Sequence, residues 1–206
     1  MYTCAMCSVH SCNSGETDKT PRNCPGLEES LNEIVKLYKD GENKKIAQVS
    51  ALVVSESYGN KTRMEETIEF LKRCNYKTIG LAFCIGLSGE AKVVNKILTH
   101  HDFVVESVIC KNGGIKREAI DITGSSVPMC NPIGQAEFLN NKNTEFNIVL
   151  GLCIGHDSLF FKYSKAPVTV LAVKDRVLAH NPFGAIYQAD SYYKEKLFPE
   201  IKEQGN

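Results

Sequence analysis

Short apolar runs alternate with helix-like patterns in the second half of the chain. Thr78–Phe83 is an apolar run bounded by turn residues, which is typical of a buried strand. Phe103–Ile109, Phe146–Leu152 and Val168–Val173 are three further runs rich in β-branched or other apolar residues. Because helical patterns lie between them, we predict a mostly parallel sheet with flanking helices, which is an α/β fold.

The helices are predicted from apolar residues at helix spacing and from capping signals. Thr62 and Glu65 form a capping box, Ser88 is expected to cap a later helix, and Asn131 precedes a proline at the first helical position. Either Asp157 or Ser158 is expected to cap the helix after the third strand. The predicted helical ranges are 27–40, 46–58, a helix opened by residue 62, 88–100 and 131–140.

Residues 1–25 differ from the rest of the chain. They are polar, rich in cysteine and without a hydrophobic period, and so short a segment cannot bury a core of its own. We therefore predict a small metal-binding knuckle over residues 1–25. An α/β domain over residues 26–206 would follow, with a helical N-terminal part and a cysteine-lined strand edge.

Charge and hydropathy limit the classes of partner. The chain has 24 basic and 24 acidic residues, and no basic block indicates nucleic-acid binding. No apolar run approaches the roughly 18 to 20 residues of a membrane helix. The first residues lack the features of a secretory signal, so a cytoplasmic location is expected.

The number of cysteines is the strongest indication of function in this sequence. The nine cysteines are an odd number, and without an export signal a disulfide framework is not expected. Reduced thiols are commonly metal ligands, nucleophiles or buried core residues. Cys74 ends a predicted helix and is interpreted as structural. The other eight fall into two groups.

The first group lies in the N-terminal segment and consists of Cys4, Cys7, Cys12 and Cys24. A two-residue gap lets both sulfurs of a tight turn face one ion. Four thiolates satisfy tetrahedral zinc or an iron–sulfur cluster. His10 is a substitute ligand, and the alternative is a tail with incidental cysteines.

The second group lies at the ends of predicted strands. Cys84, Cys110 and Cys153 each follow a strand, and Cys130 precedes a helix. In an open parallel sheet, ligands bind beyond the carboxyl ends of the strands, so these four sulfurs are expected to converge there. They would form a second metal site or a set of reactive thiols. The alternative is that each is a buried core residue.

Charged residues follow the third and fourth strands at the same edge. His156 is a candidate ligand or proton carrier beside Cys153, although a structural role is an open alternative. Lys174, Asp175 and Arg176 are candidates for binding a small redox or anionic ligand, with a solvated turn as the alternative.

Five segments carry a resemblance to a known family: Cys4-x2-Cys7 to Cys24-Pro25, residues 80–87, 129–136 and 151–160, and residues 174–182. Together they resemble the DUF1847 family, whose members are uncharacterised and suspected of binding metal. The resemblance covers nearly the whole chain and implies metal binding without implying a reaction. Some members are expected to carry a cysteine within residues 111–114, so its absence here would leave Cys110 as the sole ligand from that turn.

The expected function is that of a cytoplasmic metal-binding protein, holding zinc or an iron–sulfur cluster at the N-terminal site. The strand-edge site would perform redox chemistry or electron transfer. A second hypothesis is a cysteine-dependent enzyme with Cys153 or Cys84 as nucleophile and His156 as base. A third is a metal sensor or carrier without catalysis.

Overall fold

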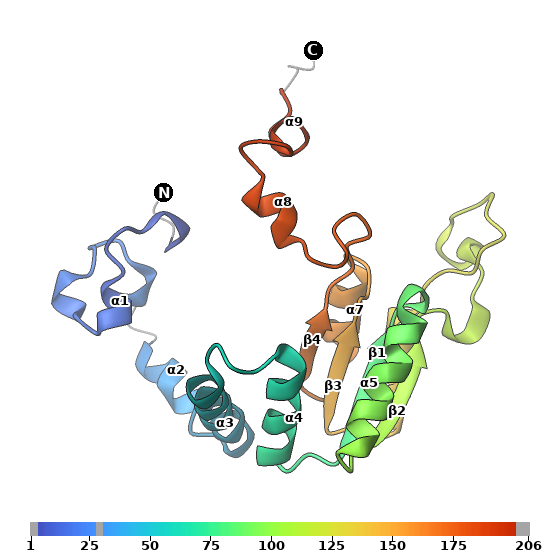
Figure 1. Cartoon of the computed structure of the whole chain (residues 1–206), viewed down its shortest axis with the longest axis horizontal. Helices are drawn as coiled ribbons and strands as arrows, with labels where there is room; N and C mark the ends of the chain where they lie inside the picture. Colours follow the sequence, from blue (N-terminus) through green and yellow to red (C-terminus); the bar gives the residue numbers. More distant parts are fainter. Residues whose placement is uncertain (1–3, 28–30, 201–206) are drawn as a thin grey trace. The chain divides into compact units, whose positions relative to one another are not determined.

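The computed structural model describes residues 4–27 and 31–200, and the chain divides into two compact units, Met1–Gly59 and Asn60–Asn206. Figure 1 follows the chain through both units from blue to red. We describe each unit by itself. The predicted boundary after residue 25 stays a prediction.

The first unit is built from short helical turns followed by two helices. α2 (Leu31–Leu37) ends earlier than the predicted helix over 27–40, whose residues 28–30 lie outside the described residues, and α3 (Gly41–Ser57) starts earlier than predicted. The reason is Asp40, whose carboxylate accepts the Glu42 N–H at 3.1 Å and so caps α3. The N-terminal segment contains 3-10 turns at Cys4–Met6, Thr17–Lys19 and Pro25–Leu27 and the one-turn helix α1 (Ser11–Ser14).

The second unit is an α/β fold around a four-stranded, all-parallel sheet, which confirms the predicted fold class. The strand order is β2-β1-β3-β4. The strands are β1 (Thr78–Phe83), β2 (Val104–Ile109), β3 (Phe146–Leu150) and β4 (Val168–Ala172).

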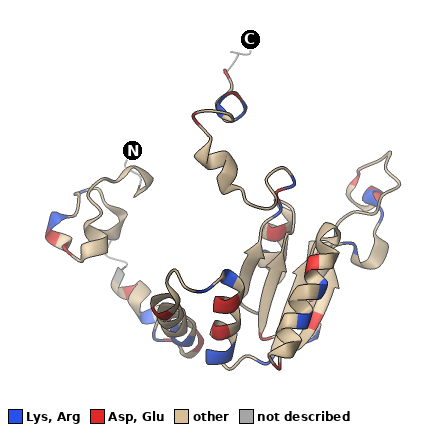
Figure 2. Ribbon diagram, viewed as in Figure 1, with Lys and Arg blue, Asp and Glu red and all other residues tan. Residues whose placement is uncertain are grey.

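Helices cover both faces of this sheet. In Figure 1, α5 crosses in front of β1 and β2, and α7 lies behind the sheet. The described helices are α4 (Arg63–Arg73), α5 (Ser88–His100), α6 (Pro132–Asn141), α7 (His156–Tyr163), α8 (Phe183–Tyr187) and α9 (Lys194–Leu197). Both basic and acidic residues lie along α4 and α5 (Figure 2).

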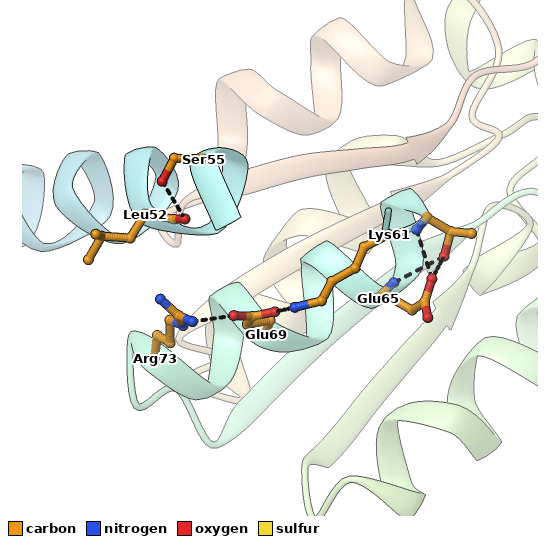
Figure 3. Close-up of polar contacts among 7 residues, drawn as sticks. Leu52, Ser55, Lys61, Glu65, Glu69 and Arg73 are labelled. Carbon is orange, nitrogen blue, oxygen red and sulfur yellow. Dashed lines mark hydrogen bonds and ion pairs between the residues drawn. The ribbon is translucent and has the colours of Figure 1, made fainter. Parts of the chain in front are cut away.

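Local sequence explains how α4 begins and where it packs. The capping box is present as predicted, because the Glu65 carboxylate accepts the Thr62 N–H at 2.7 Å and the Thr62 hydroxyl accepts the Glu65 N–H. Figure 3 shows this box and the ion pairs of Glu69 with Lys61 and Arg73. The opposite face of α4 buries Leu71 completely.

At three element ends in the second unit, the local backbone explains why the structure differs from the prediction. Ser88 is the first residue of α5, and Leu87 occupies the cap position, because residues 85–87 form a 3-10 turn before the helix. Gly155, at φ +79°, is the N-cap of α7 in place of Asp157 or Ser158. β3 ends at Leu150, because Gly151 turns into the left-handed region at φ +62°.

The core lies along β1 and β3. Every residue of β3 is buried, and four of the six residues of β1 are buried. Cys84 and Cys110 belong to this core, and Cys130 packs against it. Among the described residues, no helix is both long and apolar enough to cross a membrane.

Candidate functional site

The order of the strands reverses between β1 and β3. From β1 the chain crosses to β2 on one side, and from β3 it crosses to β4 on the other. The loops that leave β1 and β3 therefore diverge from each other at the carboxyl edge, which is where open α/β sheets bind ligands. Cys84 follows β1 at this point, and Cys153 follows β3.

Cys84 is held by backbone on both sides. Its N–H donates to Leu150 O at 3.1 Å, and its carbonyl accepts the Leu87 N–H at 2.8 Å. The Gly86 N–H donates to its sulfur. The residue is only 5 % exposed.

Cys110 lies beside Cys84 because their strands are paired. Phe83 and Ile109 are register partners, and the Cys110 N–H donates to Phe83 O at 2.9 Å. The Cys110 sulfur accepts the Ile85 N–H at 3.3 Å. The thiols of Cys84 and Cys110 are hydrogen-bonded to each other.

The loop between β2 and α6 returns Cys130 to the same place. The Asn131 N–H donates to Cys110 O at 2.8 Å, and the Asn131 side chain donates to Asn112 Oδ1 at 2.9 Å. Asn131 also caps α6 by accepting the Gly134 N–H at 2.9 Å, as predicted. Cys130 and Cys110 are hydrogen-bonded through their side chains. One asparagine therefore closes the loop, starts the helix and fixes the third thiol.

Lys174 brings a positive charge across the sheet edge to Cys84. A Cβ at Gly86 would lie 3.6 Å from Lys174 Nζ and 3.9 Å from Cys84 Sγ. A Cβ at Gly151 would lie 3.6 Å from Lys174 Cε and 2.2 Å from Leu87 Cδ1. The two glycines leave the room through which the lysine reaches the sulfur.

These neighbours shift the pKa values of the two central thiols, Cys84 and Cys110, in opposite directions. Burial works to raise the pKa of Cys84, but the Gly86 N–H, the Lys174 ammonium and the Cys110 thiol together outweigh it and lower that pKa. Burial, followed by the neighbouring sulfurs of Cys130 and Cys84, raises the pKa of Cys110 to about 12. Cys84 is thus favoured as a thiolate and Cys110 as its protonated partner.

The fourth cysteine of this group lies beside an arginine. Arg176 Nη2 donates to Cys153 Sγ at 3.3 Å, and Arg176 is exposed. The hydrogen bond and the charge of Cys153, followed by the charges of Cys84 and Cys130, raise the pKa of Arg176. Arg176 thus interacts with three of the four predicted cysteines, Cys153, Cys84 and Cys130.

The remaining polar candidates have different surroundings. The Asp175 carboxylate accepts the Val177 and Leu178 N–H groups at 2.9 Å, and the Asp175 N–H donates to His180 Nδ1 at 3.0 Å. These bonds hold the loop after β4. His156 is half-buried at the start of α7, and among the described residues no hydrogen bond joins its ring to a cysteine. The ligand-binding role predicted for Asp175 stays a prediction. So do the roles of metal ligand or base predicted for His156.

The N-terminal cysteines are more exposed. Cys4 and Cys12 are exposed, while Cys7 and Cys24 are half-buried. The Cys7 N–H donates to Cys4 O at 3.1 Å, and the Gly26 N–H donates to Cys24 Sγ at 3.4 Å. Within the described residues 4–27, Ser11 is the only buried one, so this segment has no apolar core.

Neither group forms a preformed metal site. Among the described residues, no set of three or more histidine, cysteine, aspartate or glutamate side chains is placed to hold a metal ion. All nine cysteines lie in the described part of the chain, and no disulfide joins any of them. Metal binding at either group therefore stays a prediction.

One residue near the site was not predicted from the sequence. Gln135 of α6 is fully buried, and its side-chain amide donates to Val108 O at 2.8 Å and to Phe83 O at 3.2 Å. It joins the ends of β1 and β2 just before the two central cysteines. The only signal was a glutamine on an otherwise apolar helix face.

Comparison with known proteins gives the family. Residues 24–171 match the sequence profile of a family of proteins of unknown function, DUF1847, and the chain belongs to this family. It is also similar to the uncharacterized protein MJ0455 of Methanocaldococcus jannaschii, with 50 % identity over 198 residues, covering 94 % of this chain and 97 % of the relative. No solved structure matches the chain.

Proposed function

We propose that this chain is a thiol-dependent protein whose working group is the Cys84 thiolate at the carboxyl edge of the sheet. The main observation behind this proposal is that three groups surround the Cys84 sulfur: the Gly86 N–H, the Lys174 ammonium and the Cys110 thiol. A thiolate, and not a thiol, is the nucleophile and the metal ligand. This arrangement therefore favours Cys84 over Cys153 as the nucleophile.

The proposed reaction does not need a general base. Lys174 and the Gly86 N–H stabilise the anion in the resting protein, so no histidine needs to remove the proton during the reaction. Lys174 and Arg176 also give the edge a positive character, which suits a small anionic reactant. The role of His156 as base is the weaker hypothesis.

A reactivity assay tests this proposal. The protein is pulse-labelled with limiting iodoacetamide at about pH 6, where an ordinary thiol is almost entirely protonated, and each cysteine peptide is quantified. Cys84 should label faster than the equally buried Cys74. Lys174→Met should slow the labelling of Cys84, while Lys92→Met, an exposed lysine of α5, should leave it unchanged. Equal labelling of Cys84 and Cys74 in the unchanged protein would contradict the proposal.

A second candidate function is metal binding by the N-terminal cysteines. The supporting observation is that residues 4–27 form compact turns around a single buried serine and so need another source of stability. The Gly26 N–H bond to the Cys24 sulfur is of the kind that stabilises a thiolate ligand. We propose zinc or an iron–sulfur cluster here, since both accept four thiolates.

Elemental analysis of anaerobically purified protein tests the metal hypothesis. The protein should carry zinc or iron, and Cys7→Ser should lose the equivalent held by this segment. Cys74→Ser is the matched control, because Cys74 lies outside both cysteine groups and should keep the full content. Equal metal content in the two variants would exclude the N-terminal segment as the site.

A further inference from the structure

The register of β1 and β2 places Cys84 and Cys110 at neighbouring positions where the two strands end. They directly follow the register partners Phe83 and Ile109 on neighbouring parallel strands. Such strands lie about 4.8 Å apart, which falls inside the roughly 4.4 to 6.8 Å between the Cα atoms of disulfide-bonded residues. Their side chains already form a hydrogen bond.

The surrounding contacts hold the pair in this position. The Cys110 N–H bond to Phe83 O is 2.9 Å long, and Gln135 donates to the same carbonyl and to Val108 O. The two strand ends therefore carry the two thiols as one rigid unit.

We propose that Cys84 and Cys110 form a redox dithiol that reduces a small anionic disulfide, with Cys84 attacking and Cys110 resolving. This inference rests on the proposed function, because it uses Cys84 as the nucleophile. It goes further by assigning a role to Cys110 and a chemical class to the substrate.

The reaction consists of two exchange steps. The Cys84 thiolate attacks one sulfur of the substrate disulfide, a mixed disulfide forms, and the first substrate thiolate leaves. Cys110 then loses its proton to solvent and attacks the Cys84 sulfur, which forms the Cys84–Cys110 bond and releases the second substrate thiolate. The two protein thiols are oxidised, and one substrate disulfide is reduced to two thiols.

Charge and burial indicate the substrate class. Lys174 lies beside Cys84, and the exposed Arg176 lies beside Cys153, so a reactant at this edge meets two cations. The small exposure of Cys84 selects a slender molecule over a folded protein surface. A small disulfide that carries carboxylates fits both conditions.

Glutathione disulfide, which is anionic, is the probe for the test. The reduced full-length protein is incubated with it under anaerobic conditions, quenched in acid and mapped by mass spectrometry of its peptides. We expect a peptide pair joined through Cys84 and Cys110, with the loss of two hydrogens. Cys110→Ser should stop after the first step and retain one glutathionyl group on Cys84.

Two comparisons make the result specific. Cys74→Ser should behave as the unchanged protein, because Cys74 lies outside the pair. Cystamine, a cationic disulfide, should react several-fold more slowly than glutathione disulfide, and Lys174→Met should reduce this difference. Equal rates for the two probes in the unchanged protein would overturn the anionic substrate class.

The outcomes separate this inference from the proposed function. Fast iodoacetamide labelling of Cys84 together with a lasting mixed disulfide, or with a Cys110–Cys130 bond, would overturn the dithiol and leave the proposed function standing. Slow labelling of Cys84 would overturn the proposed function itself. A Cys84–Cys110 bond that forms in the unchanged protein and in Cys74→Ser, and does not form in Cys110→Ser, supports the inference.

Discussion

Raising the pH should weaken the folded second unit through Cys110. The pKa of this thiol is raised from 9.0 to about 12 in the folded chain, first by burial and then by the neighbouring sulfurs. The folded state therefore keeps the proton that the unfolded state loses above pH 9. The stability that comes from the protonated thiol is fully present below pH 9 and is lost as the pH rises towards 12.

The size of the effect follows from linkage. A single proton released only on unfolding lowers the free energy of unfolding by about 2 kcal/mol between pH 8 and pH 10.5. Cys84 acts in the opposite direction in the lower part of this window, because its unfolded thiol still loses a proton around pH 9 while its lowered pKa leaves the folded thiol already ionised. The contribution of Cys110 is therefore the difference between the pH profiles of the unchanged protein and Cys110→Ala. The contribution of Cys84 is present above pH 9 and is lost as the pH falls through its folded pKa.

Urea unfolding under a non-thiol reductant measures this dependence. The free energy of unfolding is determined at several pH values for the unchanged protein, for Cys110→Ala and for Cys74→Ala. Cys110→Ala should be less stable at neutral pH but should lose less stability as the pH rises, while Cys74→Ala controls for the removal of a buried thiol. If the unchanged protein and Cys110→Ala show parallel pH profiles, Cys110 is not the protonated partner, and the reasoning fails.

Three further predictions concern packing, capping and disulfide exchange. Gly80→Ala places a Cβ 2.0 Å from Asn147 Oδ1 and 2.8 Å from Leu139 Cδ1, so it should cost about 1 to 3 kcal/mol in urea unfolding. Gly89→Ala, which meets nothing within 4 Å, should cost nothing. Thr62→Ala removes the capping box of α4 and should cost about 1 kcal/mol by the same measurement. Gln135→Leu removes the link between β1 and β2 and should slow formation of the Cys84–Cys110 disulfide, measured by mass spectrometry of quenched samples.

The elements best predicted from sequence are those that local interactions determine. β1 has the predicted bounds, since its apolar run is short and bounded by turn residues. The capping box of α4 and the Asn131 cap of α6 depend on residues three apart, so the pattern alone reveals them. Asp40 shows the limit of this approach, because an aspartate before a glycine indicates a helix end as well as a helix start, and here it starts α3.

The site was only partly predictable. The placement of Cys84 and Cys110 at one edge follows from strands of equal direction. That Lys174 approaches Cys84 depends on the strand order and on space left by Gly86 and Gly151, and neither can be read from local sequence. The contacts that favour Cys84 over Cys153 arise only in the folded sheet.

The central position of β1 has a consequence for the order in which the chain folds. β2 follows β1 after one helix, whereas β3, which covers the other side of β1 and accepts the Cys84 N–H, is synthesised much later. A nascent chain can thus pair β1 with β2 and bring Cys84 next to Cys110 while the β3 side is still open. In that interval the thiols are accessible to any oxidant, and a premature disulfide would join two strands before the sheet is complete. We therefore expect an oxidant present during synthesis to lower the yield of folded chain more than the same oxidant added after folding.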